Sequence, residues 1–360
     1  IYRFENMLAT NGILLLKFWF HQSKTDFKQR LKKARKDPQK AWRIDEAEWQ
    51  VYEQYDEFVQ LSEHFIRLTS SGVTPWTLVE TANPRYRNVT VMQTILKALQ
   101  GRLAEQSPPY PVEQPPMVYV NQSDRSLLST LPMDGDTDWK RYREILEGYQ
   151  AQLKQLTRQA RRAGVSSVLV FEGWDAAGKG GVIRRLTQAM DAQDYRVLPI
   201  GAPTDEEKAH HYLWRFWQQV PRDGHVVMFD RSWYGRVLVE RVEGFADHYE
   251  WQWAYSEIND FEEQLHEHGT LILKFWLHID PDEQLRRFQE REQTPYKKYK
   301  ITAEDYRNRD RWQDYEMAVT DMVSRTSTEY ARWHLIPANN KRQARIEVLK
   351  IFCQALKKAL

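Results

Sequence analysis

Nine consecutive residues in the second half of the sequence have the clearest capacity for chemistry. They read Gly173-Trp174-Asp175-Ala176-Ala177-Gly178-Lys179-Gly180-Gly181 and contain the spacing G-x-x-x-x-G-K. Glycines let successive backbone N–H groups turn toward one anion, and a lysine at the start of the next helix adds positive charge. The segment predicts a phosphate-binding loop whose contacts are Gly173, Ala177, Gly178, Lys179, Gly180 and Gly181. A glycine-rich turn that only packs a helix against a strand is the alternative.

Two aspartates are the candidate metal ligands. Phosphate loops usually carry Ser or Thr after the lysine to bind Mg²⁺, but Gly180 stands at that position here. A carboxylate must then supply the oxygen, and Asp175 lies within the loop. Asp230 follows the apolar run His225–Phe229. Because Mg²⁺ prefers a few carboxylates together with waters and phosphates, we predict that Asp175 and Asp230 bind it and act in catalysis.

Arginines follow Asp230 in the segment HVVMFDRSWYGR. Guanidinium groups bind phosphate through two parallel hydrogen bonds, so Arg231 and Arg236 are predicted to contact a transferring phosphoryl group. Asp230 could instead cap the next helix, because Asp is a favoured residue at that position. Its place after a strand and near the loop favours the catalytic role.

A basic segment follows further along the chain. Residues 284–312 contain nine Lys or Arg and five Asp or Glu, and we predict that Arg291, Lys297 and Lys300 close over the phosphates. Cations at such a lid stabilise charge in phosphoryl transfer. A solvated helical face is the alternative for about half of these residues. Residues 28–43 hold eight basic residues against one aspartate, so a second basic segment lies near the start of the chain.

Strands and helices alternate through residues 138–360. Apolar runs predict strands at 165–173, 195–200, 225–229, 270–279 and 333–337, separated by amphipathic or charged helical patterns that include 206–219. This order predicts an α/β fold with a mostly parallel sheet and helices on both faces. Because ligands bind at the carboxyl ends of parallel strands, the loop and Asp230 are expected at one edge of the sheet.

The sequence repeats itself at an offset of 257 residues. IYRFENMLATNGILLLKFWFH at the start matches INDFEEQLHEHGTLILKFWLH from Ile258, and 24 of the first 99 positions are identical. The repeat predicts a duplicated domain: residues 1–100 are the C-terminal part of a first, incomplete copy and 121–360 a complete second copy. Residues 101–120 are rich in proline and predict a semi-rigid linker.

Composition excludes several classes of protein. The 52 basic and 50 acidic residues give a formal charge of +2, which argues against a general nucleic-acid-binding protein. A single cysteine excludes an internal disulfide framework and fits a cytoplasmic location. The sequence also contains no apolar run of about 20 residues that would predict a membrane helix.

GWDAAGKGG, FDRSWYGR and a basic segment around Pro295, in this order, resemble the polyphosphate kinase 2 family over the whole second copy. An aspartate within the loop and the missing Ser or Thr are both features of that family. One position departs from it, because Thr294 precedes Pro295 where the family has Asp, whereas the first copy has Asp37 before Pro38. The resemblance implies a P-loop kinase-like, three-layer α/β/α fold with a helical lid, here duplicated.

The same resemblance implies a Mg²⁺-dependent phosphotransferase that uses inorganic polyphosphate. The fused arrangement is similar to members that convert AMP to ADP, so polyphosphate and AMP/ADP are the expected partners, with no nucleic acid and no membrane. An ATP-dependent nucleotide kinase and a non-catalytic polyanion-binding module are the alternatives. The sequence leaves open the nucleotide acceptor, polyphosphate length, reaction direction, base-binding residues, catalysis by the first copy, and whether the protein is a homo-oligomer.

Overall fold

The computed structural model describes residues 1–37, 42, 46–104, 128–133, 139–295, 301 and 303–360. It divides into two compact units, Ile1–Glu113 and Gln114–Leu360, each with its own parallel sheet. Among the described residues, no helix is both long enough and apolar enough to cross a membrane.

The second unit is built on a five-stranded sheet with the order β4-β5-β3-β6-β7, in which every pairing is parallel. Its strands are β3 (Ser167–Gly173), β4 (Tyr195–Pro199), β5 (Val226–Asp230), β6 (Leu271–His278) and β7 (Trp333–Pro337). The chain leaves β3 toward β4 on one side and leaves β6 toward β7 on the other. The carboxyl ends of β3 and β6 therefore form the point where a doubly wound sheet binds ligands.

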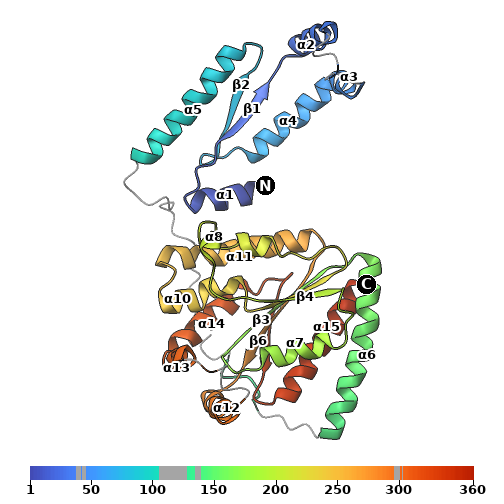
Figure 1. The fold of residues 1–360 in the computed structure, drawn as a ribbon, viewed down its shortest axis with the longest axis vertical. Helices are drawn as coiled ribbons and strands as arrows, with labels where there is room; N and C mark the ends of the chain where they lie inside the picture. The colour runs from blue at the N-terminus through green and yellow to red at the C-terminus, as the bar shows by residue number, and fades with distance from the viewer. Residues whose placement is uncertain (38–41, 43–45, 105–127, 134–138, 296–300, 302) are drawn as a thin grey trace. The chain divides into compact units, whose positions relative to one another are not determined.

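Helices cover both faces of this sheet (Figure 1). One face carries α6 (Trp139–Ala163), α7 (Lys179–Thr187) and α15 (Lys341–Ala359), which pack on one another. The other carries the 3₁₀-helix η3 (Trp233–Val237), α10 (Val239–Glu243), α11 (His248–Glu267) and α14 (Trp312–Thr326). The central strand β3 is buried from Ser167 to Glu172, as a strand covered on both faces must be. This confirms the predicted three-layer α/β architecture.

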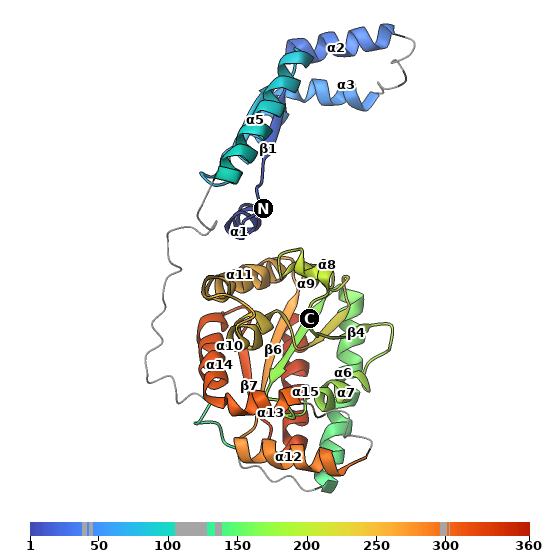
Figure 2. The same cartoon turned by 60° about the vertical axis from the view of Figure 1, so that its left-hand side comes forward.

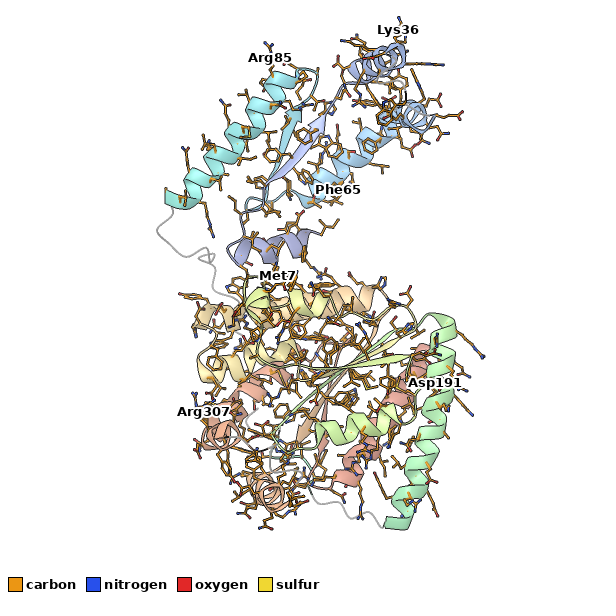
Figure 3. The ribbon with its side chains drawn as sticks, in the orientation of Figure 1. Met7, Lys36, Phe65, Arg85, Asp191 and Arg307 are labelled. Atoms are coloured by element: carbon orange, nitrogen blue, oxygen red, sulfur yellow. The ribbon has the colours of Figure 1, made fainter. Side chains whose placement is uncertain are left out.

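Two helices lie beyond the carboxyl ends of the strands, α12 (Pro281–Gln293) and α13 (Ala303–Asp310) (Figure 2). Asp280 caps α12, with its carboxylate accepting a hydrogen bond from the N–H of Glu283 at 2.7 Å. Arg307 of α13, labelled in Figure 3, forms an ion pair with Glu243 of α10 (Nε–Oε2 3.2 Å). These contacts hold the helical layer over the end of the sheet.

One predicted helix is wrong. The expected helix over residues 206–219 is two short helices, α8 (Asp205–Lys208) and α9 (Trp214–Trp217). His211 lies between them, and its Nδ1 accepts a hydrogen bond from the N–H of Leu213 at 3.3 Å. A side chain that binds nearby backbone in this way competes with the helical hydrogen bonds.

The first unit has a two-stranded parallel sheet of β1 (Lys17–His21) and β2 (Trp76–Glu80). Its helices are α1 (Tyr2–Thr10), α2 (Lys24–Lys36), α3 (Glu46–Glu53), α4 (Tyr55–Thr69) and α5 (Pro84–Ala104). At the 257-residue offset, β1 corresponds to β6, β2 to β7 and α2 to α12. The later helices α3, α4 and α5 likewise begin where α13, α14 and α15 begin.

A buried lysine occupies the same place in both units. Lys274 Nζ donates to Glu262 Oε2 at 2.7 Å and to the Thr326 carbonyl at 2.6 Å, and both charged side chains are fully buried. The corresponding Lys17 Nζ donates to Glu5 Oε2 at 2.7 Å and to the Thr69 carbonyl at 2.5 Å. In both units, therefore, the buried lysine donates to a glutamate carboxylate and to a threonine carbonyl at equivalent positions.

We predict that Lys274→Met lowers the free energy of unfolding by about 3–5 kcal/mol, because it leaves Glu262 charged and unpaired in the core. Urea unfolding measures the effect. Glu262→Gln removes that charge while keeping an oxygen for Tyr234 and Trp233, which both donate to Glu262 Oε1. The double variant should therefore lose less than Lys274→Met alone; an equal or larger loss would contradict an ion-pair origin.

Candidate functional site

The loop between β3 and α7 has a backbone that its residue types dictate. Gly173 adopts φ +145°, and a Cβ there would lie 2.5 Å from the carbonyl oxygen of Leu277 in β6. Gly178, which precedes α7, adopts φ +112°. Ala176 also lies in the left-handed region, with φ +65°, although alanine disfavours it. Glycine is thus required where β3 meets β6, and the loop is held in a conformation that alanine would not choose alone.

Lys179 and Asp175 are held by the loop and by the helices above it. Lys179 Nζ donates to the carbonyl of Gly173 at 2.6 Å. The Asp175 carboxylate accepts from Arg231 Nη2 on one oxygen and from Asn308 Nδ2 on the other, both at 3.1 Å. Gln284 Nε2 donates to the Asp175 carbonyl at 3.2 Å. Helices α12 and α13 therefore contact the loop directly.

Two neighbouring carboxyl groups in this site have opposite pKa shifts. Burial raises the pKa of Glu172, and Lys179 together with the hydroxyl of Ser232, which donates at 2.8 Å, offsets this only partly. Burial also acts to raise the pKa of Asp175, but Lys179, Arg231 and Asn308 more than offset it and hold that pKa below its usual value. Asp175 therefore keeps its negative charge more readily than Glu172 and is the better of the two carboxylates to bind a cation.

The carboxylate of Asp230 lies beside Gly180, the position at which other phosphate loops have a hydroxyl. A Cβ on Gly180 would lie 4.0 Å from Asp230 Oδ2, so the carboxylate faces the space beside the residue that follows Lys179. The next residue, Arg231, has φ +65° and its N–H donates to the Phe171 carbonyl of β3 at 3.0 Å. Strained backbone at both Ala176 and Arg231 is typical of a functional site.

A polar cleft of about 410 Å³ lies over the loop. The predicted residues that line it are Asp175, Ala177, Gly178, Lys179, Gly180, Gly181, Asp230, Arg231 and Arg291. Gly173 lines a smaller adjoining cavity, together with Trp174 and Gln284. The structure thus brings together predicted residues from β3, α7, β5 and α12, which lie far apart in the sequence.

Three predicted residues are not placed in this cleft. Arg236 packs its guanidinium over the ring of Tyr212 and pairs with Glu240 (Nε–Oε2 3.2 Å) and Glu250 (Nη1–Oε2 3.6 Å). Within the described part of the chain, it lines neither the cleft nor the adjoining cavity. Lys297 and Lys300 lie outside the described residues.

Sequence reasoning missed four polar residues that contact the loop or the residues around it: Glu172, Gln284, Arg287 and Asn308. Arg287 is 2% exposed and donates to the carbonyls of Ala176 and Ala177, each at 2.9 Å. The repeat in the sequence could have indicated Arg287, because an arginine, Arg30, occupies the equivalent position of the first copy. No motif marks the other three.

Trp174 and Trp276 line the adjoining cavity and belong to a cluster of aromatic rings. Trp174 stacks on Trp312 with ring centroids 3.6 Å apart and planes within 10°. The indole N–H groups of Trp174 and Trp276 both point to Nδ1 of His278, at 3.2 and 3.4 Å. Burial lowers the pKa of His278 to about 4, so this imidazole is neutral and accepts both bonds near neutral pH.

The geometry agrees with comparisons to known proteins. The family model described as Polyphosphate kinase 2 (PPK2) matches residues 1–107 and 136–360. The chain belongs to the polyphosphate kinase 2 family. A polyphosphate:AMP phosphotransferase of Pseudomonas aeruginosa is 51% identical over 359 residues, which cover 99% of this chain and 72% of that protein.

Other members of the polyphosphate kinase 2 family agree. A polyphosphate:AMP phosphotransferase of Acinetobacter johnsonii is 40% identical over 368 residues, covering 98% of this chain and 71% of that protein. A Polyphosphate Kinase 2 crystal structure from Arthrobacter aurescens has a TM-score of 0.62 at 38% identity, and the match covers 64% of this chain and 85% of that one. These likenesses confirm the family and fold that the sequence motifs predicted.

We predict that acid destabilises this polyphosphate kinase 2 protein partly through His278. The unfolded imidazole has a pKa near 6.5 and the folded one about 4, so the unfolded state binds the proton first and stability falls as pH drops below about 6.5. At pH 5 the loss is about 2 kcal/mol relative to pH 7. Urea unfolding at both pH values should show a smaller loss for His278→Gln than for the parent.

The matched variant His21→Gln changes the equivalent histidine in the first unit. Because His21 is exposed, this variant reports the effect of a His-to-Gln change away from the buried site. A His278→Gln variant that loses as much stability between pH 7 and pH 5 as the parent would contradict the role given to His278.

Proposed function

We propose that this chain transfers a phosphoryl group from inorganic polyphosphate to AMP and gives ADP. The convergence of the phosphate loop, Asp175, Asp230 and Arg231 in one cleft supports a phosphoryl-transfer site. The identity of 51% to a polyphosphate:AMP phosphotransferase, over 99% of this chain, supports the choice of substrates. No covalent enzyme intermediate is required, because phosphoryl transfer depends mainly on positioning and charge stabilisation.

The donor phosphates bind at the start of α7. There the backbone N–H groups of the loop, the positive end of the helix and Lys179 all act on the same anion. Lys179 Nζ now donates to the carbonyl of Gly173, so a bound phosphate would exchange for that carbonyl. Arg231, with half of its side chain exposed, and Arg291 face the same cleft and neutralise the phosphoryl group in transit.

The carboxylates of the cleft fit a divalent cation, which we propose to be Mg²⁺. Asp175 and Asp230 both line the cleft, and Asp230 Oδ2 faces the position beside Lys179 where a hydroxyl ligand is missing. Two carboxylates leave room for waters and phosphate oxygens, which complete the coordination that Mg²⁺ prefers. Bound there, the ion would supply charge that offsets the phosphates. Asp175 and Asp230 would hold it, and Arg231 orients Asp175.

We also propose that residues 1–100 are a first copy of the family's domain, matching the C-terminal part of a second copy in residues 121–360. Residues 101–120 would be the linker, although 101–104 still belong to α5. The family match to residues 1–107 and the shared Lys17 and Lys274 networks support this division.

The substrate assignment predicts ADP formation from AMP and polyphosphate. Purified protein with Mg²⁺ should convert AMP to ADP when polyphosphate is the donor, as measured by separating the nucleotides. The same reaction with ATP in place of polyphosphate is the control. Activity with ATP alone would instead favour a nucleotide kinase that uses ATP.

The role of Asp230 predicts that Asp230→Asn lowers kcat by about a hundredfold or more, because it removes a charge that holds the cation against the phosphates. Asp205→Asn is the matched control, since Asp205 is fully exposed and pairs only with Lys208 of its own helix among the ion pairs described. An Asp230→Asn variant as active as the parent would remove Asp230 from the mechanism and favour a polyanion-binding module.

A further inference from the structure

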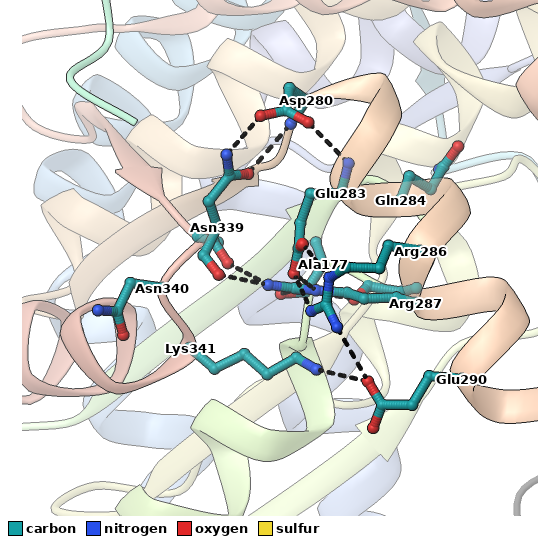
Figure 4. A network of polar contacts seen from close by, with 12 residues as sticks. Ala177, Asp280, Glu283, Gln284, Arg286, Arg287, Glu290, Asn339, Asn340 and Lys341 are labelled. Atoms are coloured by element: carbon teal, nitrogen blue, oxygen red, sulfur yellow. Dashed lines mark hydrogen bonds and ion pairs between the residues drawn. The ribbon is translucent and has the colours of Figure 1, made fainter. Parts of the chain in front are cut away.

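Arg287 is a buried arginine whose hydrogen bonds join two separate loops (Figure 4). It extends from α12 with a side chain 2% exposed. Its Nη1 donates to the carbonyls of Ala176 and Ala177 in the phosphate loop, both at 2.9 Å. Its Nη2 donates to the carbonyls of Ala338 and Asn339, at 2.6 and 2.9 Å, in the turn between β7 and α15. One planar group therefore fixes four main-chain oxygens.

These bonds decide where the amides of the phosphate loop point. In a trans peptide the C=O and the following N–H point in opposite directions. Because the Ala176 and Ala177 carbonyls are bound to Arg287, the N–H groups of Ala177 and Gly178 are directed away from it. The Ala177 N–H closes a turn on the Trp174 carbonyl at 3.0 Å, and Gly178 lines the polar cleft. Ala176, whose carbonyl Arg287 binds, has φ +65°.

The guanidinium is itself held in place. Glu283, one turn earlier on α12, accepts from Arg287 Nε at 2.5 Å. The beginning of α12 is joined to the same β7–α15 turn, because the Asp280 N–H donates to Asn339 Oδ1 at 3.2 Å and Asn339 Nδ2 donates back to the Asp280 carboxylate. Arg287 thus acts from a rigid base, which is what an orienting group needs.

We propose that Arg287 is a positioning residue that sets the phosphate loop for the donor: by holding the Ala177 carbonyl away from the cleft, it directs the Gly178 N–H toward the polyphosphate. This inference rests on the proposed function, since it takes polyphosphate as the donor. Arg287 does not contact the substrate. It acts through the Ala176 and Ala177 carbonyls, and its loss should therefore weaken donor binding more than acceptor binding.

Arg287→Lys is the main test, with Arg287→Met as a second variant. Lysine keeps the charge but carries its donors on one nitrogen, which cannot serve two pairs of carbonyls on separate loops. We expect the KM for polyphosphate to rise about tenfold to a hundredfold, which corresponds to losing hydrogen bonds from a charged donor. The KM for AMP should stay within about twofold of the parent, and methionine should give a larger effect on polyphosphate.

Arg286→Lys is the matched control. Arg286 is the neighbouring arginine and also donates to Glu283, but its side chain is 59% exposed and its ion pairs are with Glu283 and Glu290 of its own helix. It should keep the parent's KM values. Thermal unfolding of all variants, and a titration of active sites, separate loss of folded protein from loss of donor binding.

Different results would overturn the proposed function and the positioning role of Arg287. A parent protein without polyphosphate-dependent ADP formation would overturn the proposed function itself. An active parent with Arg287→Lys showing an unchanged KM for polyphosphate would overturn the positioning role. A lower Tm with both KM values unchanged in the remaining active enzyme would also overturn it, because that result indicates a purely structural arginine.

Discussion

The phosphate loop can present its N–H groups to an anion only if its carbonyl groups find partners elsewhere. Buried main-chain oxygens without hydrogen bonds are costly, so each one turned away from the cleft must be bound on its far side. In this protein Gln284 and Arg287 of α12 bind the carbonyls of Asp175, Ala176 and Ala177. Helix α12 is therefore part of the loop's architecture as well as part of the layer that covers it.

The charged side chains of the site, like the loop carbonyls, already have partners within the protein. Before any phosphate binds, the cations are occupied by the protein's own groups: Lys179 by the Gly173 carbonyl, and Arg231 by Asp175. A phosphate donor that arrives with a divalent cation can replace both sets of partners at once. The anion would take the place of the carbonyl at Lys179, and Asp175 would hold the divalent cation. Such an exchange avoids leaving an isolated charge in a partly buried site, which would be costly.

The sequence predicted those parts of the site that depend on local order along the chain. The loop follows from glycine spacing after an apolar run, and Asp230 follows from its place at the end of β5. Contacts between residues far apart in the sequence are not marked by any local pattern of residues. Asn308 and Gln284 reach Asp175 from positions more than a hundred residues away. Arg236 shows the converse, because it is close to Asp230 in sequence, yet the 3₁₀-helix η3 turns it toward Tyr212.

Comparison of the two units separates the requirements of the fold from those of the site. The buried lysine and its glutamate and carbonyl partners occur in both, at Lys17 and Lys274, because each sheet needs its core polar groups satisfied. Two positions that contact Asp175 of the phosphate loop differ: Gln284 corresponds to Phe27, and Asn308 to Val51. The scaffold can therefore persist without the polar contacts of the cleft. Arg30, which matches Arg287, is retained, and Arg287 differs from Gln284 in that it also binds the turn between β7 and α15. The equivalent elements β2 and α5 are present in the first unit, so this second contact belongs to the fold rather than to the cleft.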